Sequence, residues 1–228
     1  MSDALTLPEK IIRTKRKSIA LIIERDGALV VRAPRWASDD DIMRVIAKKR
    51  SWIIKKQELF RMLPVCDPKH RFLPGEAFFL LGKQYTLTFS SRLRPSLVFD
   101  GINFSLSRSK LGKAKESFIV WYKKFAMDYI SRRATHFATL HSIRYRSVKI
   151  TSARTRWGSC TTRGDLNFSY RLVIAPPAII DYVIVHELCH IGQMNHSRGF
   201  WINVGAILPD FRERRKWLNA YGKTLTIE

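Results

Sequence analysis

The sequence has few cysteines and few acidic residues, and it has no apolar run long enough to cross a bilayer. Its three cysteines, Cys66, Cys160 and Cys189, are odd in number and widely spaced, so we expect no disulfide framework and a reducing cytoplasm. The longest apolar run, residues 175–185, is interrupted by an aspartate and is too short for a transmembrane helix. The first residues, MSDALTLPEK, lack the basic-then-apolar order of a secretion signal. These absences predict a folded cytoplasmic protein without a membrane segment.

The shortage of acidic residues leaves the chain strongly positive. Lysine and arginine number 41 against 19 aspartates and glutamates, which gives a formal net charge of +22 at pH 7. Such a field attracts nucleic acids, nucleotides and acidic partners, but it also serves to keep a protein in solution. No zinc-knuckle, helix-turn-helix or RNA-recognition signature indicates direct reading of bases. Charge alone therefore names no partner.

The pattern of apolar residues predicts an α+β chain in two parts. The first, residues 1–107, is expected to be rich in β-hairpins with one helix, and the second, residues 108–228, to hold the functional domain. Residues 18–33 are typical of two strands joined at Asp26-Gly27. Residues 38–60 are typical of a helix that a serine caps and an acidic first turn begins.

Two more hairpins and a long helix follow. Residues 78–89 predict a hairpin that turns at Gly82-Lys83, and residues 96–106 predict one that turns at Asp100-Gly101. Aromatic and apolar residues then recur at helical spacing over residues 113–141. The first part of the chain is thus mainly β, and a long helix opens the second.

The last third reads as strand, turn, strand and helix. Strands are predicted over residues 148–160 and 166–175, and the two prolines at 176–177 suit the first turn of a helix. Gly192 is expected to end this helix, and Ser197 can cap the next one.

The predicted helix ends in HELCHIGQMNH, which holds three of the six histidines. On an α-helix, His186 and His190 lie one turn apart and point the same way, so both imidazoles can reach one ion. Glu187 is rotated from them by about 100° and can lie beside a metal without binding it. His196 follows a predicted turn that can fold the chain back toward the ion. Three protein ligands with one open position define a catalytic zinc site, and a neighbouring carboxylate is its general base.

The alternative is that the three histidines make ordinary hydrogen bonds within the core or at helix ends. One histidine could do so at little cost, but three imidazoles that converge with a glutamate are expensive to bury unless an ion joins them. Cys189 points about 100° away from His190 around the helix, and we interpret it as a small packed hydrophobe.

These motifs resemble a known family. The resemblance is to the YgjP-like metallopeptidases, and more distantly to the SprT-like proteases, over RWGSC at 156–160, residues 172–190, NHSRGFW at 195–201 and residues 209–218. It implies a zincin-like fold, with an active-site helix packed on a small sheet, in which His186, His190 and His196 bind Zn²⁺ and Glu187 is the catalytic acid and base. Metzincins place a glycine where this chain has Gln193, so that subclass is disfavoured.

Six residues around the two last strands are candidate substrate-binding residues: Arg154, Arg156, Trp157, Ser159, Asn167 and Tyr170. The arginines could hold a carboxylate or phosphate and the tryptophan could form a pocket wall. Alternatively, the tryptophan fills the core and the arginines remain in solvent. An oxyanion partner is expected among Arg154, Arg156 and Tyr170. The strand at 166–175 is expected to border the substrate, and Asp181 or Asp210 could orient a ligand imidazole.

Three functions are compatible with this pattern. The leading expectation is a zinc-dependent metallopeptidase that acts on a peptide or protein substrate. A metal-dependent nucleotide hydrolase would suit the positive charge, but no Walker-type glycine loop occurs, and Mg²⁺ prefers oxygen ligands. The third is a DNA-associated protease-like protein that binds nucleic acid through its phosphates.

Overall fold

A computed structural model describes residues 7–23, 28–61, 70–91 and 94–227. The chain forms two compact units, Met1–Val65 and Cys66–Glu228. The boundary expected from the sequence lies later, at 107/108. The strands between residues 66 and 107 belong to the larger unit because their aromatic side chains share its core, as the stacked rings of Phe78 and Phe118 show, with centroids 4.1 Å apart.

The smaller unit contains a three-stranded sheet and two helices: β1 (Lys10–Thr14), β2 (Ala20–Ile23), β3 (Leu29–Pro34), α1 (Asp39–Lys48) and α2 (Arg50–Arg61). β2 and β3 pair antiparallel as predicted, although the expected turn at Asp26-Gly27 lies outside the described residues. β1 adds to the other edge of β3 in parallel. The sheet and helices bury a core of their own, which includes Val31, Ile42 and Ile53.

The predicted helix over residues 38–60 is two helices. Ser38 caps the first, since its hydroxyl accepts from the backbone N–H of Asp41 (3.1 Å) and the Asp41 carboxylate accepts from the N–H of Ser38 (3.0 Å). The break falls at Lys49, whose φ of −107° and ψ of 11° depart from helical values.

The larger unit contains two small mixed sheets. The first has the order β4-β5-β7-β6, with β4 (Ala77–Leu80), β5 (Lys83–Ser90), β6 (Leu97–Phe99) and β7 (Asn103–Ser107). Both predicted hairpins are confirmed, and β5 pairs with β7 in parallel. The first hairpin turns at Leu81 and Gly82, one residue earlier than predicted, and both residues have positive φ (51° and 75°).

The second sheet has the order β8-β10-β9, with β8 (Ser147–Thr151), β9 (Gly158–Cys160) and β10 (Asp165–Ser169). The strand predicted over residues 166–175 therefore ends at Ser169. Residues Tyr170–Ile174 form a 3-10 turn instead, whose buried Leu172, Val173 and Ile174 belong to the main core. Tertiary packing, which an apolar run cannot reveal, decides between strand and turn here.

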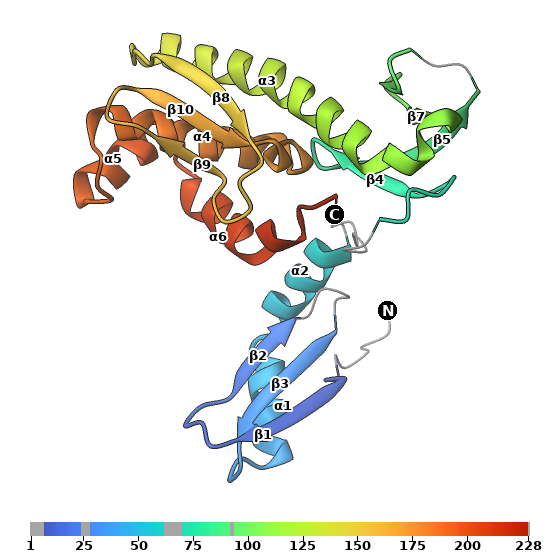
Figure 1. The fold of residues 1–228 in the computed structure, drawn as a ribbon. Coiled ribbons are helices and arrows are strands. Elements are labelled where there is room, and N and C mark those ends of the chain that lie inside the picture. The colour runs from blue at the N-terminus through green and yellow to red at the C-terminus, as the bar shows by residue number, and fades with distance from the viewer. Residues whose placement is uncertain (1–6, 24–27, 62–69, 92–93, 228) are drawn as a thin grey trace. The chain divides into compact units, whose positions relative to one another are not determined.

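Four helices complete the unit: α3 (Ala114–Leu140), α4 (Pro177–Gly192), α5 (Arg198–Ile207) and α6 (Phe211–Tyr221). α3 buries a stripe at helical spacing that includes Phe118, Tyr122, Ala126 and Ile130. It runs along β8 and also contacts α4 (Figure 1). The α+β class predicted from the sequence is confirmed. Among the described residues, none of the helices is both long enough and apolar enough to cross a membrane.

Two contacts fix the start of α4. In the turn of the β4–β5 hairpin, the N–H of Leu81 donates to the carbonyl of Val173 (2.7 Å) and that of Gly82 donates to the carbonyl of Ile174 (3.1 Å). The Arg133 guanidinium on α3 binds both carboxylate oxygens of Asp181 on α4, at 2.8 and 2.7 Å. A hairpin and a bidentate ion pair thus hold the helix that carries the histidines.

Gly82 provides a test of the hairpin's role. A Cβ at Gly82 would lie 2.9 Å from Cγ of Pro176, whereas a Cβ at Gly101, which also has positive φ, meets nothing within 4 Å. Gly101→Ala should cost about 1 kcal/mol through backbone strain alone. Gly82→Ala should cost about 1–3 kcal/mol more, because Pro176 must move. Urea unfolding followed by circular dichroism measures both, and equal losses would contradict the docking of this hairpin on the segment before α4.

Candidate metal centre

α4 is buried among its neighbours, and their packing fixes the position of its C-terminal end. It contacts α3, β9, α5 and α6, and its apolar residues face the core on nearly all sides. Pro177 stands in the first turn, where a missing N–H costs nothing. Near the other end, Glu187 and His190 are only 5% and 9% exposed. Polar groups at this depth need partners, so this turn is where a ligand is expected.

A short turn brings the third histidine back to the helix. Residues after Gly192 reverse direction, and the hydroxyl of Ser197 caps α5 by accepting from the N–H of Phe200 (3.4 Å). Nε2 of His196 then lies 3.0 Å from Nε2 of His186. One nitrogen from each of His186, His190 and His196 lies within 4.8 Å of the other two. The three predicted metal-binding residues are therefore brought together.

The protonation states of the imidazoles suit metal binding. Burial, with the nearby imidazoles and Arg215 acting in the same direction, lowers the pKa of His186 to about 3. Burial also lowers the pKa of His196. Nδ1 of His190 lies 3.0 Å from the carbonyl oxygen of Gln193, which can only accept, so Nδ1 is the donor in this hydrogen bond and Nε2 is the nitrogen left for a metal. Neutral imidazoles with free lone pairs are the form that binds a metal.

The residues present fit a divalent metal ion. Nδ1 of His186 is buried and has no hydrogen-bond partner among the described residues. Phe200 packs against all three rings, with centroids 4.5 to 4.9 Å away, and helps to hold them in place. Cys189 is buried, and burial raises the pKa of its thiol to about 11; among the described residues it does not belong to the group whose ligand atoms converge. The donor set is three nitrogens, which suits zinc and its neighbours in the first transition row.

Glu187 lies beneath strand β9 and does not join the histidine cluster. Burial raises the pKa of its carboxyl to about 8. A Cβ at Gly158 in β9 would lie 2.6 Å from Oε1 and 2.7 Å from Cγ of this glutamate. Only glycine allows the strand to come so close. Gly158 was not among the site residues expected from the sequence, although a glycine inside a predicted strand is a signal of close approach.

Four of the six candidate substrate-binding residues lie together. Arg156, Trp157, Ser159 and Asn167 line a cavity of about 200 Å³ beside β9. The Nδ2 of Asn167 donates to Oγ of Ser159 (3.4 Å). Trp157 is half-buried and joins the main core as well, so it both forms a wall of the cavity and fills the interior.

The other two do not join them. Tyr170 is buried in the main core, in the 3-10 turn that follows β10, because the predicted strand ends before it. Arg154 is exposed in the turn before β9, outside the lining of this cavity. Tyr170 therefore cannot contribute to this cavity from its position in the core.

Two further expectations are wrong. Asp181 binds Arg133, and Asp210 forms an ion pair with Arg214, with 2.9 Å between Oδ1 and Nε, so within the described residues neither carboxylate is hydrogen-bonded to an imidazole. The carbonyl of Gln193 holds His190 instead. In addition, the strand expected to offer an edge to a peptide, β10, is the central strand of its sheet and has no free edge, and β9 forms the edge nearest Glu187.

His196 is the proposed ligand that lies outside α4, in the turn that follows the helix. Removal of its imidazole tests the metal centre. His196→Ala should weaken metal binding by at least about 10–100-fold, the range seen when even a residue that supports a ligand is lost. Elemental analysis and competition with a chelator measure the affinity. His136→Ala, which removes an exposed histidine of α3, is the matched control and should bind like wild type. Undiminished affinity in His196→Ala would exclude this residue as a ligand.

Among comparisons with known proteins, the match to a family model agrees with the geometry. The family described as YgjP-like, metallopeptidase domain, matches residues 17–221. A comparison with curated proteins finds no match. Among solved structures, the crystal structure of the metallopeptidase zymogen of Pyrococcus abyssi abylysin is similar, with 16% identity over 41% of this chain and 96% of that chain. The TM-score of this alignment is 0.38. The family match spans most of the sequence: the chain belongs to the YgjP-like metallopeptidases and is a metal-dependent hydrolase.

Proposed function

We propose that the protein is a zinc-dependent peptidase in which Glu187 is the general acid and base. The observation that carries this proposal is the convergence of three imidazole nitrogens within 4.8 Å, next in sequence to a glutamate that is 5% exposed. The resident ion would be held by His186, His190 and His196. Zinc is favoured because three nitrogens with no sulfur or carboxylate in the set are typical of its catalytic sites. When bound, the ion supplies Lewis acidity to the carbonyl group of the substrate.

Glu187 would move the proton of the reaction. In its deprotonated form the carboxylate accepts a proton from the attacking water and then returns it to the departing amine. A cation nearby favours this deprotonated form, against the burial that raises the pKa to about 8. The backbone of β9 at Gly158 leaves the carboxyl little room to move, so the base is held in one position.

The edge strand β9 is the proposed binding site for the peptide. An extended substrate can add to the edge of a sheet through backbone hydrogen bonds, and β9 is the edge strand that lies against Glu187. The cavity lined by Arg156, Trp157, Ser159 and Asn167 would then accept a substrate side chain. Arg156 remains the proposed oxyanion partner. Free thiols at Cys160 and Cys189 suit a reducing compartment, and we place the protein in the cytoplasm.

The base assignment is tested by Glu187→Gln. The variant should bind metal as wild type does, because this residue is not a ligand, and should lose at least about 100-fold in kcat, the usual contribution of a general base. Release of fluorescence from quenched, unstructured peptides measures turnover, with nucleoside triphosphates assayed in parallel. Wild-type turnover in this variant would show that another group is the base.

The close approach of β9 is tested by Gly158→Ala. The added methyl group must displace the Glu187 carboxyl, so peptide turnover should fall by about 10–100-fold while metal content is retained. Gly112→Ala is the matched control, because a Cβ there meets nothing within 4 Å. If Gly158→Ala is as active as Gly112→Ala, the position of Glu187 against the strand does not matter for the reaction.

A further inference from the structure

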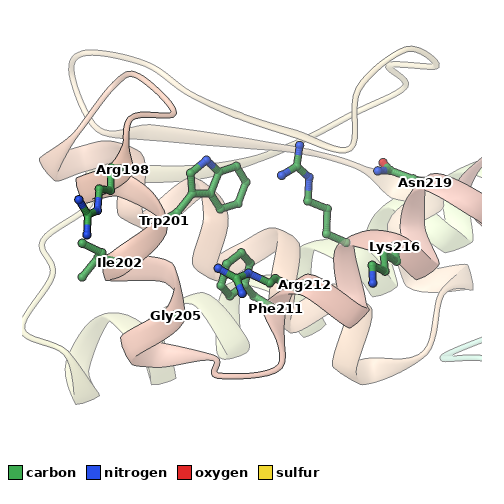
Figure 2. Close-up of a pocket in the computed structure, with 9 residues that line it drawn as sticks. Arg198, Trp201, Ile202, Gly205, Phe211, Arg212, Lys216 and Asn219 are labelled. Atoms are coloured by element: carbon green, nitrogen blue, oxygen red, sulfur yellow. The ribbon is translucent and has the colours of Figure 1, made fainter.

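A second cavity lies between α5 and α6, close to the metal centre. Its volume is about 770 Å³. From α5 it is lined by Arg198, Trp201, Ile202 and Gly205, and from α6 by Phe211, Arg212, Arg215, Lys216 and Asn219 (Figure 2). None of the residues discussed above as candidate ligands, base or substrate-binding residues is part of this lining.

The cavity is cationic and its charges are not neutralised. Four of the nine lining residues are basic, Arg198, Arg212, Arg215 and Lys216, and none is acidic. All four are exposed, and none forms an ion pair with a carboxylate among the described residues. The neighbouring Arg214, which does not line the cavity, is paired with Asp210. A concave surface with one sign of charge attracts ligands of the other sign.

Two aromatic rings of the cavity, Trp201 and Phe211, which form its aromatic floor, orient two of these cations. The guanidinium of Arg215 lies 4.6 Å from the ring centroid of Trp201, and that of Arg212 lies 5.6 Å from that of Phe211. The rings of Trp201 and Phe211 are themselves stacked, with centroids 5.4 Å apart and planes 14° apart. A guanidinium that rests on a ring face keeps its N–H edge free, and this edge matches the two oxygens of a carboxylate.

Trp201 connects the cavity to the metal centre. Its ring is stacked against that of His196, with centroids 5.6 Å apart and an angle of 19° between the planes. The centroid of His186 lies 5.7 Å from the same ring. One aromatic side chain therefore touches two proposed metal ligands and a cationic group of the cavity. The two centroid distances that link His196 to Arg215 through this ring are 5.6 and 4.6 Å, a span of at most about three residues of extended chain.

We infer that the cavity between α5 and α6 is a carboxylate-binding subsite, and that the enzyme prefers peptides with an acidic group near the bond it cleaves. The inference rests on the proposed peptidase function. The group is either an Asp or Glu side chain or the free C-terminal carboxylate, since both present the same two oxygens. Through this subsite, part of the protein's positive charge would determine substrate specificity.

Paired quenched-fluorescent peptides test the preference. Each pair differs only in Glu against Gln at one position on either side of the cleaved bond, and a further pair differs in a free against an amidated C-terminus. At low ionic strength we expect kcat/KM to be about 10-fold higher for the acidic member, and the ratio to approach one at high salt. The position that responds distinguishes a side-chain carboxylate from a terminal one.

Arg212→Gln/Lys216→Gln tests whether the cavity causes the preference. Arg215 is left unchanged because it lies against Trp201, beside His196. The ratio between the acidic and neutral peptides should fall from about 10 to about 3. Arg108→Gln/Lys115→Gln removes the same charge from exposed residues outside the cavity, and should keep the wild-type ratio.

A second measurement does not depend on turnover. Anisotropy of rhodamine-labelled Glu and Gln peptides with metal-free protein reports binding, and the acidic peptide should bind more tightly to wild type than to the cavity variant. Two outcomes would overturn the subsite and leave the peptidase function standing. One is that peptides are cleaved without a preference for the acidic member. The other is that both double variants lower the ratio of kcat/KM between acidic and neutral peptides equally. If the metal-loaded protein cleaves no peptide, the peptidase function fails, and equal binding of the two peptides then overturns the subsite as well.

Discussion

The candidate site depends on the burial of one turn of α4. Because α3, β9, α5 and α6 all pack on this helix, Glu187 and His190 near its end are buried, and polar groups at this depth need partners or a ligand. Burial also lowers the pKa values of His186 and His196 and raises that of Glu187. The same packing that stabilises the helix thus prepares nitrogen lone pairs for a metal.

The surroundings of the site limit movement on several sides. Phe200 packs against the three imidazoles, the carbonyl of Gln193 holds the ring of His190, and the backbone of β9 at Gly158 lies against the carboxyl of Glu187. At the far end of the helix, the β4–β5 hairpin and the Arg133–Asp181 pair fix where α4 begins. Catalytic groups work best when packing has already removed their freedom to reorient, and here that packing comes from five separate segments.

The two sides of the site differ in chemistry. Beside β9, a small cavity is lined by polar residues and half-buried Trp157, whereas between α5 and α6 a larger cavity combines aromatic rings with four basic residues. The first cavity includes Gly158, which lies against Glu187, and the second includes Trp201, which stacks on His196. Part of the net charge of +22 is thus concentrated in the cavity between α5 and α6, where it can attract an anionic group of a substrate.

The sequence alone determined the local features. The spacing of His186 and His190 follows from helical periodicity, the hairpins follow from their turn residues, and Ser38 and Ser197 cap helices because their hydroxyls accept backbone N–H groups. Contacts between distant segments were decided only by the tertiary structure. They place Gly158 on Glu187, put Tyr170 in the core, pair Asp181 with Arg133, and gather Arg198, Arg212, Arg215 and Lys216 around one cavity. A local sequence pattern reflects interactions between residues that are close along the chain. The contacts between distant segments depend instead on which surfaces pack together, and the sequence of one segment does not determine this packing.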